Sequence, residues 1–162
     1  MKVRSNILIA AGIGVLIGVL ATVLVLFVAM PSMMIKTYET SYSYDETIER
    51  LQERIDNAGW VVSGISRLND SLSKHGVDLK PRVTLLSLCH PEYAKSVLAT
   101  DRYISVMMPC KFSIWEGDDG KAYLTKMNMG LMGKLFGGNI AEVMGGRVAV
   151  DEEQILEGLL KK

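Results

Sequence analysis

The chain has 162 residues and carries 18 basic and 18 acidic side chains, so its formal net charge is zero. This length fits one domain, and a hydrophobic content of 49% argues against disorder. Only Lys2 and Arg4 precede a long uncharged run, and the remainder carries 16 basic and 18 acidic residues. A nucleic-acid-binding protein is not expected, because such a protein clusters its basic side chains.

The uncharged run extends from Ile7 to Met30, and Thr22 is its only polar side chain. A helix of this length is about 36 Å long and can cross a hydrocarbon core of about 30 Å. The alternative is a cleaved signal peptide, but its apolar stretch is usually only about 7–15 residues. We expect a single-pass protein of the cell inner membrane, with residues 1–6 cytoplasmic, 7–30 in the membrane and 31–34 as a connector. The basic flank places the remainder in the periplasm.

Small residues recur every fourth position within this run, at Ala10, Gly14 and Gly18. This spacing allows the backbones of two membrane helices to approach closely. It predicts a helix–helix contact, although glycine is also common in membrane helices without any such role.

After the connector, the residues from Ile35 to Tyr42 favour a strand. Ser43 and Glu46 have the spacing of a capping box, and an apolar stripe with helical periodicity follows them. Gly59 is expected to end this helix. A strand over 60–65 and a short helix over 68–75 come next.

The region from Val83 to Cys89 is predicted to be a buried strand, and Pro91 is well placed to start a helix that runs to Ala99. A long strand over 104–115, interrupted at Pro109, precedes a turn at 118–120 and a hairpin strand over 122–127. A Gly- and Met-rich stretch and a helix over 150–160 complete the chain. This order predicts an α+β fold, an antiparallel or mixed sheet with helices mainly on one face. The core domain is expected at 35–128, with 129–162 as an added segment.

Several short motifs in this region resemble the domain-of-unknown-function 302 family. They are Ser43–Thr47 with Leu51 and Gly59-Trp60, then Leu88–Pro91, Met108–Cys110, and Ile114–Glu116 with Gly120-Lys121. The resemblance covers about Met34 to Asn128. It implies a compact fold with a TATA-binding-protein-like arrangement, frequent association as a homodimer, and no established enzymatic activity. His90 stands where the family tends to have Asn.

Two cysteines, Cys89 and Cys110, would lie in an oxidising compartment if the domain is periplasmic. They are candidates for a disulfide or a redox pair, and the alternative is a pair of buried, unreactive thiols. Neither belongs to a Cys-x-x-Cys motif.

A soft-metal site is a further possibility, because sulfur and imidazole ligands suit copper. Its candidate ligands are Cys89, His90, Cys110, Met127 and Met129. Adjacent residues of a strand point to opposite faces, which argues against joint ligation by Cys89 and His90. Non-covalent haem bound through His75, His90 or a methionine is the other cofactor considered, and no cofactor is the main expectation. Gly-x-Ser-x-Gly is absent, and no catalytic residue is predicted.

The stretch after Asn128 has one apolar helical face. Its members are Leu131, Met132, Leu135, Phe136, Ile140, Val143 and Met144. This face can pack on the domain's own sheet, or it can contact the bilayer or a partner, since methionine is common on adaptable binding surfaces. Together these features predict a membrane-anchored, non-catalytic binding module or accessory subunit of an envelope protein complex. The alternative function is a periplasmic redox, copper or haem protein.

Overall fold

The computed structural model describes residues 2–161, with side chains from residue 11 onward. The chain divides into a helical unit that ends at Met34 and a second unit that begins at Ile35.

The first unit is one helix, α1 (Lys2–Met34), and its segment Ala11–Met34 is long and apolar enough to span a membrane. Residues 31–34, predicted as a connector, continue the helix to Met34. Pro31 removes only one backbone donor from the helix, and the turn after it remains helical. The hydroxyl groups of Thr22 and Ser32 donate to carbonyl oxygens of the same helix, each at 2.8 Å.

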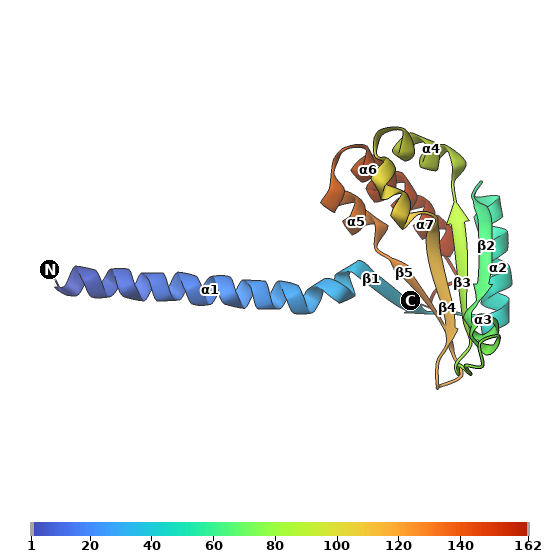
Figure 1. Ribbon diagram of the computed structural model, residues 1–162, viewed down its shortest axis with the longest axis horizontal. Helices are drawn as coiled ribbons and strands as arrows, with labels where there is room; N and C mark the ends of the chain where they lie inside the picture. The colour runs from blue at the N-terminus through green and yellow to red at the C-terminus, as the bar shows by residue number, and fades with distance from the viewer. Residues whose placement is uncertain (1, 162) are drawn as a thin grey trace. The chain divides into compact units, whose positions relative to one another are not determined.

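The second unit contains a five-stranded sheet in the order β1-β5-β4-β3-β2, in which every pair is antiparallel (Figure 1). Its strands are β1 (Ile35–Glu39), β2 (Val61–Arg67), β3 (Val83–Cys89), β4 (Cys110–Glu116) and β5 (Ala122–Met127). The predicted α+β class is therefore confirmed, and the sheet is antiparallel rather than mixed.

Helices follow or separate most of the strands. They are α2 (Tyr44–Asn57), α3 (Leu68–Ser73), α4 (Pro91–Thr100), the 3₁₀-helix η1 (Arg102–Met107), α5 (Met129–Phe136), α6 (Gly138–Glu142), the π-helix η2 (Val143–Val148) and α7 (Ala149–Leu156). Ser43 precedes α2 at the N-cap position, but its side chain makes no cap hydrogen bond. The predicted capping box is therefore wrong in its hydrogen bonding, although the helix begins where expected.

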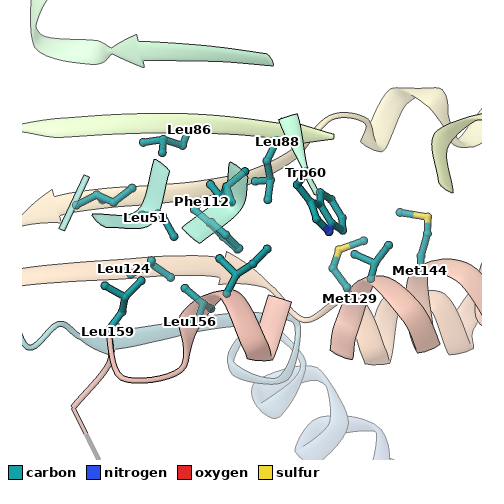
Figure 2. Close-up of a cluster of buried hydrophobic side chains, with 14 of the residues drawn as sticks. Leu51, Trp60, Leu86, Leu88, Phe112, Leu124, Met129, Met144, Leu156 and Leu159 are labelled. Atoms are coloured by element: carbon teal, nitrogen blue, oxygen red, sulfur yellow. The ribbon is translucent and has the colours of Figure 1, made fainter. Parts of the chain in front are cut away.

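The core lies between one face of the sheet and the helices α2 and α7. Side chains alternate along the strands, so Leu86, Phe112 and Leu124 of adjacent strands point to the same side and are fully buried. Leu156 of α7 joins them, and Figure 2 shows this cluster between the strands and α7. In β3, predicted as a buried strand, only alternate residues are fully buried, and the other side chains are half-buried.

The long strand predicted over 104–115 is wrong in its first half. Residues 102–107 form η1, and the chain enters β4 only at Cys110, after a cis peptide bond between Met108 and Pro109. Ile104 is buried in the core from this 3₁₀-helix. An apolar residue every few positions fits either element, so the pattern alone did not exclude a strand.

The C-terminal segment belongs to the fold, which corrects the predicted domain boundary after residue 128. α5 and η2 cross with their backbones in contact at Gly133 and Gly145. Farther along, the backbone N–H of Lys161 donates to the carbonyl of Glu39 at 2.9 Å, and Leu160 forms a bridge with Thr40. The end of the chain therefore lies beside β1, and the compact unit extends through residue 161.

Candidate functional site

The short segment Met108-Pro109-Cys110, which leads from η1 into the first residue of β4, borders two hollows of the domain. The first, here the cysteine pocket, is also lined by Cys89, His90, Trp60, Tyr93 and Met144. The second, here the methionine cavity, is also lined by Met107, Met127, Met129, Val106, Lys111 and Glu152. Both hollows therefore take sulfur atoms from the same turn of the chain.

Strand geometry brings the two cysteines to the cysteine pocket without setting them opposite each other. Cys110 pairs with Leu88 across β3 and β4, whereas Cys89 pairs with Val61 on the other neighbour of β3. Both cysteines are free thiols in the structure, so the disulfide stays a prediction. Burial raises the pKa of the Cys110 thiol to about 12, and the charges of Glu152 and Cys89 add to this effect. Cys110 is protonated at neutral pH and is a weak nucleophile.

Aromatic rings form one wall of the cysteine pocket. The His90 imidazole stacks on Tyr93 at 3.9 Å between ring centroids, and Trp60 meets it edge-on at 5.6 Å. The Trp60 indole Nε1 donates to Asp151 at 3.1 Å. Burial and the nearby Asp151 carboxylate raise the pKa of Tyr93. These contacts fix the rings, and Figure 2 shows Trp60 at the end of the core near Met129 and Met144.

The Nδ1 atom of His90 is buried and has no hydrogen-bond partner in the structure. A buried polar atom without a partner is unusual and often marks a ligand, ion or water position. The cysteine pocket has a volume of only about 30 Å³, however, which is room for one water molecule or one ion. The residues around His90 therefore do not fit a haem, and His75 lies exposed after α3.

The methionine cavity is larger, at about 210 Å³, and four thioether side chains line it. Glu152 of its lining forms an ion pair with Lys126, with side chains 2% and 11% exposed. Burial raises the pKa of Glu152, although the Lys126 charge opposes this change. The cavity thus combines soft sulfur atoms with a neutralised pair of charges.

The predicted metal ligands do not all meet in one place. Of these two hollows, Cys89 and His90 line the cysteine pocket, Met127 and Met129 line the methionine cavity, and Cys110 borders both. Among the residues that the structure describes, no group of three or more His, Cys, Asp or Glu side chains could hold a metal ion. The residues present fit a soft, thioether-rich site better than a zinc-type site.

The apolar face predicted after Asn128 is divided by the fold. Four of its members are buried within the domain and cannot contact a bilayer or a partner, which corrects that part of the prediction: Met132, Ile140, Val143 and Met144. Leu131 is half-buried, whereas Leu135 and Phe136 are 67% and 42% exposed.

The predicted helix–helix contact of α1 stays a prediction. Gly14 and Gly18 have no neighbouring atoms within 4 Å of where a Cβ would be, so this face is free in the structure. The side chain of Ala10 lies outside the described residues.

A third hollow, here the α7 groove, lies beside β1 and α7 and has a volume of about 730 Å³. Lys36 and Tyr38 line it from the strand, and Glu153 and Glu157 line it from the helical side. The sequence gives no sign of this groove, because these two sides are more than 100 residues apart in the chain.

Other residues of these sites were also missed. Tyr93 and Asp151, and the position of Trp60 beside His90, became visible only in the fold. Lys126 offered a signal, since strand alternation sets it on the same face as Leu124. Its inward position called for an acidic partner, and Glu152 is that partner.

Comparison with known proteins supports the fold. A solved structure of an uncharacterised conserved DUF302 protein from Bacillus stearothermophilus is similar, with a TM-score of 0.69 and 20% sequence identity. The match covers 78% of this chain and 98% of that one. Among curated proteins, no relative matches. The family model described as domain of unknown function DUF302 matches residues 36–161, including the C-terminal segment that the sequence analysis had set apart. The chain belongs to the DUF302 family.

Proposed function

We propose that the protein is a membrane-anchored, extracytoplasmic binding module without catalytic activity. The observation that carries the anchor is the surface of α1, whose apolar side chains are exposed around the helix. Val15, Leu24 and Phe27, for example, are 68%, 63% and 77% exposed. In water this surface is unfavourable by about 25 cal/mol per Å², and lipid removes that cost. Thr22 and Ser32 satisfy their hydroxyl groups within the helix, as a bilayer requires.

Lys2 and Arg4 support an orientation with the N-terminus in the cytoplasm and the DUF302 domain in the periplasm. The test is alkaline carbonate extraction of membranes, combined with protease treatment of spheroplasts that carry a C-terminally tagged chain. We expect a full-length chain that resists extraction and whose tag is digested from outside. A shortened, extractable chain contradicts the anchor and supports a signal sequence, and a protected tag contradicts the orientation.

The α7 groove supports binding rather than catalysis. Its volume of about 730 Å³ is in the range of small-molecule sites, and its lining combines apolar side chains with charges of both signs. The raised pKa of Cys110 also argues against an activated thiol nucleophile. An amphipathic ligand or a segment of an envelope protein fits these properties.

Chemical crosslinking in native membranes, followed by identification of the products, tests this binding role. Lys36→Glu reverses a charge in the α7 groove and is expected to reduce recovery of the partner. Lys95→Glu, at an exposed position of α4 outside the groove, is the matched control. Recovery of a self-dimer alone contradicts a hetero-partner and supports the homodimer that the family resemblance implies. Equal recovery with both variants contradicts the groove as the site.

A second candidate function is binding of Cu(I), favoured by the four methionines and Cys110 around the methionine cavity. Thioether and thiol ligands prefer this ion. Titration with Cu(I) against a competing chelator tests it. Met129→Leu and Cys110→Ser should each weaken binding, whereas Met30→Leu in α1 should not. Equal affinity for all three variants contradicts the site.

A further inference from the structure

An exposed apolar surface begins where the domain is joined to α1. Ile35, the first residue of β1, follows Met34 directly and pairs with Met127 at the end of β5. These two side chains are 53% and 39% exposed. Because one peptide bond joins Ile35 to α1, this end of the sheet is held at the end of the helix whatever the orientation of the domain.

Two helices extend this surface. Val106 of η1 lines the methionine cavity together with Met127, so η1 lies beside this end of β5. Tyr103 and Val106 are three residues apart in the 3₁₀-helix and therefore share a face, and they are 63% and 87% exposed. Side chains of this size are rarely so exposed in one small region of a soluble domain.

The surface then continues onto α5. The rings of Tyr103 and Phe136 are in contact, with centroids 6.5 Å apart, and Leu135 precedes Phe136 in the helix. Ile35, Met127, Val106, Tyr103, Phe136 and Leu135 thus form a connected set, here the apolar rim. Each member is joined to the next by strand pairing, a shared cavity, a helical turn, a ring contact or a peptide bond.

The charges around the apolar rim favour contact with an anionic membrane surface. η1 contains Arg102 and no acidic residue, and α5 contains Lys134 and no acidic residue. The residues that follow the N-terminal flank carry a net charge of −2. These two segments are therefore basic within a part of the chain that is slightly acidic as a whole. Aromatic and aliphatic side chains flanked by basic ones are typical of segments that lie in the headgroup region of a membrane.

We infer that the apolar rim rests in the interface of the membrane that α1 spans and that it recognises anionic lipid headgroups. This inference relies on the anchor in the proposed function and adds a second membrane contact to it. The rim inserts Val106 and Leu135 by about 5–10 Å, as interfacial helices do. The domain is thereby fixed against the bilayer beside the methionine cavity, which Val106 and Met127 of the rim also line.

Spin labels on the full-length chain in vesicles of phosphatidylethanolamine and phosphatidylglycerol test the inference. Val106→Cys and Leu135→Cys report on the rim, and Asp118→Cys at the β4–β5 turn is the control, in a Cys89→Ala, Cys110→Ala background. At 106 and 135 we expect greater accessibility to oxygen than to a water-soluble nickel complex, and the reverse at 118. Aqueous signals at all three positions in vesicle-bound protein overturn the inference. Low accessibility to both probes at 106 overturns it as well, because that result indicates burial against a second copy.

Hydrogen exchange of the chain with its native cysteines provides a measurement that does not depend on the labelled variants. Segments 102–107 and 129–136 should exchange at least about tenfold more slowly in anionic vesicles than in neutral detergent, while the turn at 117–121 is unchanged. Equal rates in the two environments overturn the inference. Failure of the anchor gives a different result, because alkaline carbonate then releases the chain from the vesicles.

Discussion

The crossing of α5 and η2 can be tested with one added methyl group. A Cβ placed on Gly133 would lie 2.3 Å from the backbone nitrogen of Gly145 and 2.5 Å from its Cα. These are backbone atoms, so no side-chain rotation can relieve the overlap. Gly133→Ala must therefore separate the two helices or distort one of them, which also displaces Met132 and Met144 in the core.

The magnitude follows from two opposing terms. Overpacking of this kind costs about 1–3 kcal/mol, and the upper end applies here because the atoms in contact are rigid. Alanine recovers up to about 1 kcal/mol of helix propensity relative to glycine. The expected loss of unfolding free energy is therefore about 2 kcal/mol, which lowers the urea midpoint by about 1 M for a typical m-value.

Gly130→Ala on the same helix is the matched control. Its Cβ would meet atoms no closer than 3.5 Å, so the variant gains the same propensity without the overlap. Urea unfolding of the full-length protein in mild detergent, followed by the fluorescence of Trp60 and Trp115, compares the two. A midpoint for Gly133→Ala equal to or above that of Gly130→Ala refutes the close packing of α5 on η2.

Three further predictions concern the buried ionisable groups. With a pKa of about 12, Cys110 has less than about one thiolate in 10³ at pH 8, so alkylation of a folded Cys89→Ala variant should be slow and should accelerate on unfolding. Loss of either partner of the Lys126–Glu152 pair should lower the free energy of unfolding by about 3–5 kcal/mol, because the other charge stays buried without a partner. The double variant Lys126→Met, Glu152→Met should lose far less stability, and a double variant as unstable as the single ones contradicts this reasoning. The raised pKa of Glu152 means that the folded state retains its proton above the ordinary value of 4.5, so stability should fall as pH rises from 4.5 to the raised pKa. Urea midpoints at several pH values measure this dependence of stability on pH, which Glu152→Gln should reduce. An unchanged pH dependence in that variant contradicts the assignment of the effect to Glu152.

Local signals in the sequence were sufficient for most elements. β3 and β5 have the predicted bounds, and α4 begins at Pro91 because proline suits the first helical position. The turn before β5 contains Gly120 at a φ of 74°, which a residue with a Cβ rarely adopts. These features depend on neighbours in the chain, and the sequence shows such neighbours directly.

Elements that depend on distant contacts were harder to predict from the sequence. Residues 102–107 have an apolar pattern that suits a strand, but they form η1, where Ile104 is buried in the core. The segment after Asn128 has one apolar helical face, yet only the fold shows that Val143 is inside the domain and Leu135 outside. Periodicity identifies a face but not the surface that covers it.

The candidate sites show the same division. The sequence marked Cys89, His90 and Cys110 by residue type, and the fold brought them to one small pocket. The fold also assigned Met127 to a different cavity, because β4 separates β5 from β3 in the sheet.

The sequence by itself determined that a long apolar helix precedes an α+β domain, because hydropathy and short-range periodicity are local properties. Its short motifs resembled the DUF302 family, whose model matches residues 36–161. Tertiary structure alone decided which sulfur atoms share a cavity, that Lys126 meets Glu152, and that six apolar side chains from four elements form one exposed rim. These features join residues that are tens to about 100 positions apart, and only packing of the complete chain brings such residues together.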